Sequence, residues 1–130
     1  MTDPITRLTE AIEHSTIRTS GVFAPNAELD ATVPNWRFTV RGAADVEDTL
    51  AGWYAHPGHF EAITRVPITG GELLRFVLTW EEHGEPYMCH QAHVIEVEHD
   101  RIVRDTVFCG GRWDSALMAE MEEAASAVGV

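Results

Sequence analysis

Three polar side chains of the types used in acid–base chemistry lie between residues 89 and 111. Gln91 and His93 are two positions apart, and Asp105 follows on the far side of a short polar turn. An imidazole held by a carboxylate can take up a proton, and an amide beside it can donate a hydrogen bond to a carbonyl oxygen. We therefore interpret the three as a candidate catalytic group for proton abstraction next to a carbonyl. Asp105 either takes the proton or holds His93 so that it can.

The alternation of apolar residues predicts that all three face one side of a β-hairpin. Residues 87–98 and 101–109 read as its two strands, and Gln91 and His93 share the phase of the apolar positions in the first strand. Asp105 shares the more apolar phase of the second strand, unless a bulge near the turn reverses it. Neighbours across strands come within about 5 Å, so we expect His93 and Asp105 to hydrogen-bond directly or through one water.

A carboxylate on the apolar face needs an explanation, because an unpaired buried charge is very unfavourable. Two explanations stay open. In the first, Asp105, His93 and Gln91 border a polar, functional pocket. In the second, Asp105 and His93 form a purely structural polar pair and Gln91 is its amide neighbour.

The rest of the chain supplies elements that can position this hairpin. Residues 2–21 predict a helix capped by Asp3 and stopped at Gly21, and residues 43–58 predict a second helix. Residues 27–42 read as one bent strand with Pro34 as its irregularity, and residues 74–80 as a strand with a strongly apolar face. Residues 114–128 predict a final helix capped by Asp114, and its apolar stripe consists of Leu117, Met118, Met121 and Ala125.

This order predicts an α+β fold in which helices pack on one face of a curved antiparallel sheet and leave a conical cavity. The length of 130 residues predicts one domain over residues 1–130.

With these elements in place, the chain resembles the nuclear transport factor 2-like superfamily, and within it the SnoaL-like group. The resemblance covers nearly all of residues 3–113 and rests on the element order and on two stretches, ELDATVPNWRFTVRG (28–42) and HVIEVEHDRIVRDTVF (93–108). It implies a cone-shaped sheet wrapped by helices and a homodimer. The group includes polyketide cyclases, ketosteroid isomerases, epoxide hydrolases, dehydratases and proteins that only bind a ligand, and the fold does not choose among them.

The resemblance also implies roles for particular residues. Gln91-x-His93 and Asp105 match in type and order the polar residues of the aromatic polyketide cyclases, and Asn35 lies where those cyclases place a pocket Asn. Ketosteroid isomerases hold their proton-shuttling Asp in the same stretch. This chain reads VPNW there, so an isomerase with that base is not expected.

A cavity for a flat, apolar ligand needs apolar walls, and several aromatic residues have suitable spacing. We predict substrate contacts from Asn35, Trp36, Trp53, Phe76, Trp80 and Cys109. Phe38, Tyr54 and Phe108 are further aromatic candidates, and all of these aromatics are alternatively plain core residues.

Composition excludes several classes of partner. The formal net charge is −12, with no basic stripe, so nucleic acid and anionic membrane surfaces are not expected partners. The N-terminus shows no targeting signal, which predicts a cytoplasmic protein with Cys89 and Cys109 reduced. His56 and His59 lack a third metal ligand at suitable spacing, and we expect no metal and no cofactor.

Three functions are compatible with the sequence. The first is a cofactor-independent cyclase, isomerase or lyase of the dehydratase type, acting on a hydrophobic carbonyl compound. The second is a non-catalytic protein that binds a small hydrophobic ligand in the same pocket. The third is a dimeric interaction module that uses the open face of the sheet, which would require a filled cone and a large exposed apolar patch.

Overall fold

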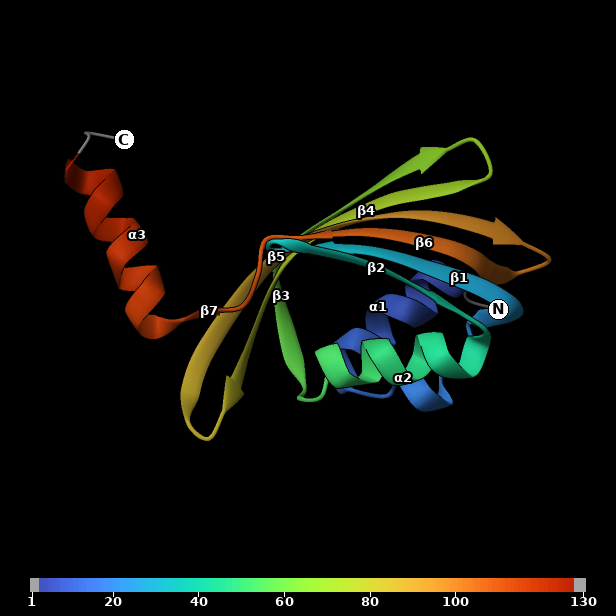
Figure 1. The fold of residues 1–130 in the computed structure, drawn as a ribbon, viewed down its shortest axis with the longest axis horizontal. Coiled ribbons are helices and arrows are strands. Elements are labelled where there is room, and N and C mark those ends of the chain that lie inside the picture. The colour runs from blue at the N-terminus through green and yellow to red at the C-terminus, as the bar shows by residue number, and fades with distance from the viewer. Residues whose placement is uncertain (1–2, 128–130) are drawn as a thin grey trace.

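One strongly curved sheet organises the protein, as Figure 1 shows. The structure is a computed structural model that describes residues 3–127. Seven strands form the sheet: β1 (Phe23–Val33), β2 (Trp36–Arg41), β3 (Gly58–Ile68), β4 (Gly71–Glu82), β5 (Glu85–Glu98), β6 (Arg101–Cys109) and β7 (Trp113–Asp114). Their order is β2-β1-β6-β5-β4-β3, and β7 pairs with β5.

All strand pairs are antiparallel except β1 and β6, which run parallel. The predicted antiparallel sheet is therefore a mixed one. The parallel pair arises because the chain crosses from β2 to the far edge of the sheet at β3 and returns strand by strand until β6 meets β1.

The helices are α1 (Pro4–His14), the short 3₁₀ helix η1 (Ile17–Thr19), α2 (Ala43–Trp53) and α3 (Ser115–Ala127). Figure 1 shows α1 and α2 on one face of the sheet, which we call the inner face, and α3 apart from the body of the molecule. The α+β cone predicted from the sequence is confirmed. None of the helices within residues 3–127 has the length and apolar character that crossing a bilayer requires.

The first helix begins where the sequence predicts and ends earlier. The Asp3 side chain accepts hydrogen bonds from the backbone N–H groups of Ile5 and Thr6, at 3.1 and 2.9 Å. The helix stops at His14 because Ser15 adopts a left-handed conformation, with φ of 58°, and its N–H caps the last turn. The predicted stop at Gly21 is therefore wrong. Residue 2 of the first predicted helix and residue 128 of the last lie outside the described residues.

The predicted bent strand over residues 27–42 is also wrong, because this stretch is a hairpin. Val33 pairs with Trp36, and Pro34 and Asn35 form the two-residue turn between β1 and β2. Proline suits the first turn position, and Asn35 adopts the left-handed conformation required at the second, with φ of 61°. The turn places Asn35 and Trp36 at the exposed tip of the hairpin.

The meander from β4 to β6 follows the predicted alternation. The bounds of β6 agree with the predicted strand 101–109, and β4 and β5 each extend their predicted strands. The bulge considered in the sequence analysis is present: the register shifts between Glu96 and Val97, opposite Arg104 and Ile102. It lies on the turn side of Asp105, so Ile102 replaces Val103 on the inner face while Asp105 still points inward.

The core lies between the inner face and the two helices. Leu8 and Ile12 of α1 and Val46 and Leu50 of α2 are fully buried against it. On the sheet side the buried apolar residues are Leu29, Ala31, Leu74, Phe76, Leu78, Cys89, Ile95, Ile102 and Val107. The helices cover only part of this face, and an apolar cavity remains beyond the end of α2.

Candidate functional site

Four polar side chains form a connected cluster inside the cone. The His93 Nδ1 atom lies 3.0 and 2.9 Å from the two carboxylate oxygens of Asp105. The Nε2 atom of His93 lies 3.0 Å from Gln91 Oε1 and 3.3 Å from the hydroxyl oxygen of Tyr54. The Tyr54 hydroxyl in turn donates a hydrogen bond to Gln91 Oε1. We call Tyr54, Gln91, His93 and Asp105 the polar cluster.

Three of its members come from neighbouring strands. Gln91 and His93 are inward-facing residues of β5, and His93 pairs with Val107 of β6. Asp105 pairs with Ile95, so it is the diagonal neighbour of His93, and its side chain spans the offset. The prediction that all three residues face inward is confirmed, because each is buried.

Tyr54 joins the cluster from the end of α2. The helix ends at Trp53, and Tyr54 is its C-terminal cap residue, with its N–H bonded to the carbonyl oxygen of Leu50. The Ser15 hydroxyl donates to the Tyr54 carbonyl oxygen at 2.7 Å and fixes the backbone where the helix stops. The Tyr54 ring is thereby held against the inner face of β5.

Hydrogen-bond chemistry restricts the protons in the cluster. A carboxylate only accepts hydrogen bonds, so Nδ1 of His93 carries a proton and donates a hydrogen bond to Asp105. The remaining heavy atoms then fit two arrangements. Either Nε2 is also protonated and donates to Gln91 Oε1, or the Gln91 amide is turned so that its NH₂ faces a bare Nε2. In the second arrangement Nε2 of His93 is free to accept a proton.

Burial keeps Tyr54 in its neutral form. Loss of solvation is the largest influence and raises the pKa of the Tyr54 phenol well above its usual value of 10, and nearby acidic groups, Asp105 among them, add to the effect. The hydrogen bond to Gln91 acts in the opposite direction and does not outweigh burial. At neutral pH Tyr54 is therefore a hydrogen-bond donor inside an apolar site.

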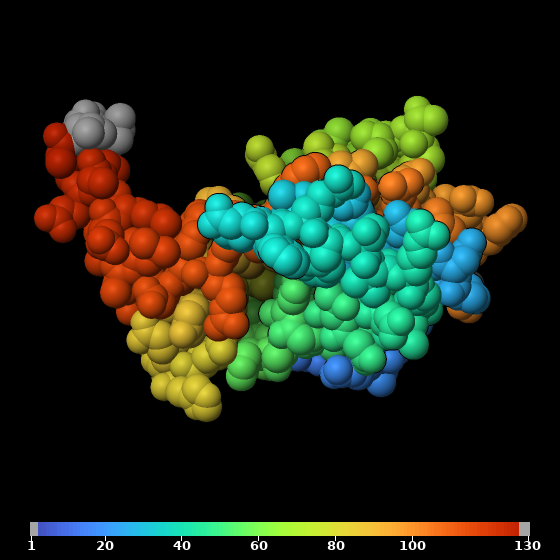
Figure 2. All heavy atoms as spheres, viewed as in Figure 1, coloured from blue at the N-terminus to red at the C-terminus, as the bar shows by residue number. Residues whose placement is uncertain are grey.

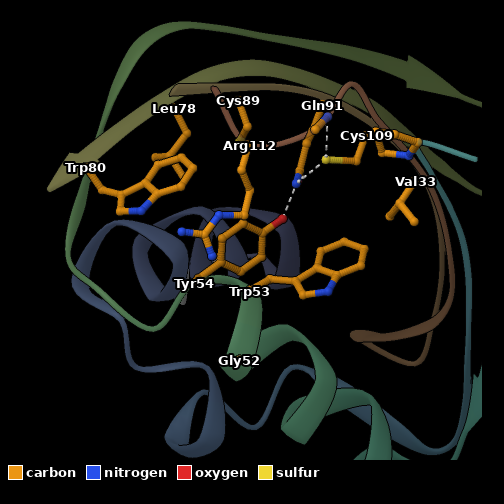
Figure 3. Close-up of a pocket in the computed structure, with 12 residues that line it drawn as sticks. Val33, Gly52, Trp53, Tyr54, Leu78, Trp80, Cys89, Gln91, Cys109 and Arg112 are labelled. Carbon is orange, nitrogen blue, oxygen red and sulfur yellow. Dashed lines mark hydrogen bonds between the residues drawn. The ribbon is translucent and has the colours of Figure 1, made fainter. Parts of the chain in front are cut away.

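The cluster ends at a cavity of about 340 Å³. Figure 3 shows Leu78 and Trp80 at one side of this space, Gln91 and Cys109 at the other, and Tyr54 between them with its hydroxyl toward Gln91. Figure 2 shows the surface hollowed between the end of α2, in green, and the orange segment that leads to α3. The residues that line the cavity are Val33, Pro34, Gly52, Trp53, Tyr54, Leu78, Trp80, Cys89, Gln91, Cys109, Gly111 and Arg112.

The three predicted catalytic residues differ in their access to this cavity. Gln91 lines it, whereas His93 and Asp105 are fully buried and do not. The ring of His93 stacks on Phe76, with ring centres 5.4 Å apart. A ligand in the cavity would therefore meet Gln91 and Tyr54 first, with His93 and Asp105 behind them.

Half of the predicted substrate-contact residues line the cavity. These are Trp53, Trp80 and Cys109, and their contact with a substrate stays a prediction. Asn35 and Trp36 do not line the cavity, because the unpredicted turn at Pro34 and Asn35 carries both of them to the exposed hairpin tip. Phe76 is also absent from this wall, because its ring is buried between Phe60 and His93 beneath the polar cluster.

Tyr54 and Arg112, two polar residues of the cavity wall, were given no chemical role from the sequence. Tyr54 was only one of several aromatic candidates, although its place after Trp53 at a helix end before Pro57 was a usable signal. Arg112 reaches the cavity from the segment after β6, lies over the rings of Tyr87 and Trp80 at 4.9 and 5.9 Å, and pairs with Glu82. Nothing local in the sequence indicates this contact.

Both cysteines that border the cavity are free thiols. Burial is the main cause that raises the pKa of the Cys89 thiol to about 12, so this side chain is an uncharged part of the wall. The Cys109 sulfur accepts hydrogen bonds from the Gln91 amide and the Gly111 N–H, at 3.3 and 3.4 Å. Cys109 therefore fixes the side of Gln91 that faces away from Tyr54.

Metal-ligand side chains do not gather anywhere in the described part of the chain. Residues 3–127 contain no group of three or more His, Cys, Asp or Glu side chains that could hold a metal ion. His56 instead lies 3.7 Å from Glu82 at the rim of the sheet.

Comparison with known proteins identifies the fold. No protein-family model matches the sequence, and no curated protein matches it. A proposed polyketide cyclase from Xanthomonas campestris is 15% identical, with 81% of this chain and 86% of that chain covered and a TM-score of 0.63. A protein with a ketosteroid isomerase-like fold from Catenulispora acidiphila, in complex with trimethylamine, is also 15% identical, with 82% and 85% covered and a TM-score of 0.62.

A protein of unknown function from Cytophaga hutchinsonii, described as nuclear transport factor 2-like, is 11% identical, with 82% of this chain and 96% of that chain covered and a TM-score of 0.56. The chain therefore has the nuclear transport factor 2-like, ketosteroid isomerase-like fold. This confirms the fold that the sequence resemblance implies.

Proposed function

We propose that the protein binds a hydrophobic carbonyl compound in the cavity and performs cofactor-independent acid–base chemistry on it. One observation carries the proposal: an unbroken path of hydrogen-bonding atoms runs from Asp105 through His93 to Tyr54 and Gln91 at the cavity wall. A buried Asp–His pair is not needed to fill a core and is expensive to desolvate. Its connection to an apolar cavity is what acid–base catalysis would use.

In the proposed reaction Tyr54 relays a proton. The relay uses the arrangement in which the Gln91 NH₂ group is turned toward the cluster, so that the Tyr54 hydroxyl donates to the bare Nε2 of His93, 3.3 Å away, in place of Gln91 Oε1. The hydroxyl oxygen then accepts the proton that leaves the carbon next to the carbonyl, while its own proton passes to Nε2. Tyr54 is neutral before and after the step, in keeping with its raised pKa. Asp105 holds the tautomer of His93 with Nε2 free and stabilises the imidazolium that forms.

The Gln91 amide is proposed to assist at the oxygen of the ligand. With its NH₂ group directed toward the cavity side of the cluster, it would donate a hydrogen bond to the oxygen as enolate character develops. Trp53, Trp80 and Cys109 would contact the apolar part of the ligand, in keeping with their place in the wall. The proposed substrates are thus limited to compounds that place a carbonyl oxygen within reach of Gln91 and Tyr54.

A second function is favoured by one feature of the site. His93 and Asp105 are fully buried and do not line the cavity, which is compatible with a non-catalytic protein that binds a hydrophobic ligand and uses the polar cluster only for shape. The third alternative, an interaction module with a filled cone, is not supported by the open cavity. The enzyme and the binding protein therefore need an experiment that measures binding and proton transfer separately.

Exchange of hydrogen for deuterium next to the carbonyl provides that separation. Aromatic and cyclic ketones are incubated with the protein in D₂O and followed by NMR, while fluorescence of Trp53 and Trp80 in the cavity wall reports binding. The enzyme predicts exchange above the buffer rate and a loss of about 10²–10⁴-fold in Tyr54→Phe and in Asp105→Asn. Binding without exchange would establish the binding protein, and near-normal exchange by folded Asp105→Asn would remove the proposed role of the carboxylate.

A further inference from the structure

Arg112 brings a positive charge to a cavity wall that is otherwise mostly apolar. Of the residues within 3–127 that line the cavity, it is the only one of a type that is charged at neutral pH. Figure 3 shows its side chain directed into the space that Tyr54 and Gln91 border, on the Trp80 side of that space. The proposed proton relay does not use this guanidinium, so its place in the wall has another cause.

The backbone is fixed on both sides of Arg112. The Gly110 N–H donates a hydrogen bond to the His90 carbonyl oxygen at 3.0 Å, and Trp113 pairs with β5. Between these two contacts Gly111 has φ of 110°, a conformation that favours glycine. The segment therefore presents Arg112 at one defined place beside the cavity.

Strand alternation sets the direction of the side chain. Trp113 turns to the outer face of the sheet, opposite α1 and α2, where its ring packs on His90 with ring centres 4.8 Å apart. His90 borders a mostly apolar groove on that face, together with Ala92 and Phe108. Because neighbouring residues of an extended chain point to opposite sides, Arg112 points to the inner face and the cavity.

Two aromatic rings and one carboxylate hold the guanidinium there. It lies over the rings of Tyr87 and Trp80, which stack on each other with centres 5.7 Å apart. The Nη2 group of Arg112 donates to Glu82 Oε2, and the same oxygen accepts a hydrogen bond of 2.8 Å from the Trp80 indole N–H. These contacts keep the charge at the cavity instead of letting it extend into solvent.

Most of the hydrogen-bonding capacity of Arg112 is left unused. A guanidinium carries five N–H donors in one plane, and within residues 3–127 only the Nη2 group of Arg112 has a hydrogen-bond partner. The side chain is 58% exposed, so water reaches the remaining donors in the free protein. A planar set of free donors is suited to a carboxylate, which accepts two parallel hydrogen bonds.

We propose that Arg112 binds a carboxylate of the substrate, and that the substrate is a hydrophobic keto acid whose two oxygen-bearing groups lie at opposite ends. The assignment rests on the proposed function in one respect, since Gln91 and Tyr54 are taken to hold the carbonyl end. The formal net charge of −12 repels anionic ligands from the protein as a whole. An arginine in the wall is what would admit one, and the carboxylate would then fix which carbon faces Tyr54.

Calorimetric titration with matched ligands tests this preference. 3-Acetylbenzoate and 4-acetylbenzoate each carry a ketone and a carboxylate on one ring, and their methyl esters lack the charge. We expect the better of the two acids to bind the wild type about 10-fold more tightly than its ester, because the contact with Arg112 is charge-assisted but partly exposed. Arg112→Gln should abolish the preference.

Variants at Glu82 separate a ligand contact from a purely structural ion pair. Glu82→Gln frees Arg112 of its internal carboxylate and should tighten binding of the acid several-fold without changing that of the ester. Glu82→Gln with Arg112→Gln should bind both equally, since no unpaired Glu82 is left to repel the acid. Arg41→Gln and Glu28→Gln are the controls: this exposed pair, at 3.4 Å, lies outside the cavity, and neither variant should alter the preference. Near-ultraviolet circular dichroism checks that each variant keeps its fold.

The outcomes keep the carboxylate site apart from the proposed chemistry. Binding of an acid that depends on Arg112, without deuterium exchange next to its ketone, would support the site and refute the chemistry. Equal binding of acid and ester by the wild type would overturn the site, and so would the absence of binding of either acid at millimolar concentration. A preference for the acid that persists in Glu82→Gln with Arg112→Gln would also overturn it, whatever the exchange rates of neutral ketones.

Discussion

Apolar residues are usually buried and polar residues exposed, and the two faces of the sheet break this pattern in opposite ways. The inner face buries Gln91, His93 and Asp105 among apolar side chains, with the latter two fully buried. The outer face leaves apolar side chains such as Phe108 and Val66 exposed between ion pairs. The same strands β5 and β6 produce both effects, because alternate residues point to opposite faces.

This difference separates two kinds of functional constraint. Burying an Asp–His pair carries a desolvation cost that a pair of apolar residues would avoid, and its presence beside the cavity points to chemistry there. An exposed apolar groove lowers the solubility of the protein, and its presence points to a surface that a partner covers. On the inner face the informative residues are therefore the buried polar ones, and on the outer face they are the exposed apolar ones.

Breaking the inner pair should have the largest effect. Asp105→Ala leaves the Nδ1–H group of His93 buried without an acceptor, and we expect a loss of about 3–5 kcal/mol in the free energy of unfolding. Chemical denaturation by urea measures it. The double variant His93→Leu with Asp105→Leu removes both polar groups and should recover most of the loss, since matched apolar replacements of buried pairs are often tolerated.

An outer-face aspartate gives the matched control. Asp30 pairs with Arg37 through two hydrogen bonds of 2.9 and 2.7 Å, and the Arg37 side chain is largely exposed to solvent. Because water can replace the lost partner, Asp30→Ala should destabilise the protein much less than Asp105→Ala. Equal losses for the two variants would contradict the distinction between the faces.

The next largest effect is expected from the tyrosine that covers the inner pair. Tyr54→Phe removes the hydroxyl donor to Gln91 and should cost about 1–2 kcal/mol at neutral pH. The pH dependence has a definite sign. Because burial raises the pKa of Tyr54 above the value of about 10 in the unfolded chain, its contribution is complete below pH 10 and is lost as the pH rises beyond it.

Unfolding measured at pH 8 to 11 checks this prediction. The wild type should lose stability above pH 10 faster than Tyr54→Phe does, so the difference between the two narrows. Tyr87→Phe serves as the control at neutral pH, since Tyr87 is half-buried and its hydroxyl makes no hydrogen bond within residues 3–127. We expect it to change stability by less than about 0.5 kcal/mol. If the difference in the free energy of unfolding between wild type and Tyr54→Phe stayed constant across this pH range, the Tyr54 phenol would not be shielded from solvent.

The orientation of the inner residues was predictable because strand alternation is a local property. The phase of Ile95 and Val97 was enough to place Gln91 and His93 inward, and the phase of Val107 placed Asp105. Val97 lies next to the bulge, which nevertheless left these orientations unchanged because it falls on the turn side of Asp105. The helices and strands β4 to β6 followed from similar local patterns, whereas the β1–β2 hairpin and strand β3 did not.

How deep each polar residue lies behind the cavity wall was not predictable in this way. Whether His93 touches the cavity depends on Tyr54, which arrives from α2 and is 39 residues away in the sequence. The predicted positions of Asn35 and Trp36 were wrong for a local reason instead. The Pro-Asn pair was interpreted as an irregularity in one strand, and a two-residue turn at that point moves both side chains from the expected pocket to a hairpin tip.

The smallest effect on folding is expected at Phe108, next to a buried neighbour on the same strand. Val107 is fully buried on the inner face, whereas Phe108 is 52% exposed on the outer face. At concentrations where the chain is monomeric, Phe108→Ser should change the free energy of unfolding by no more than about 0.5 kcal/mol. Val107→Thr, which buries a hydroxyl without changing shape, should cost about 1–3 kcal/mol. A loss above about 1 kcal/mol for monomeric Phe108→Ser would mean that the outer face contributes to the folding core, and its exposed apolar residues would then not need a partner to explain them.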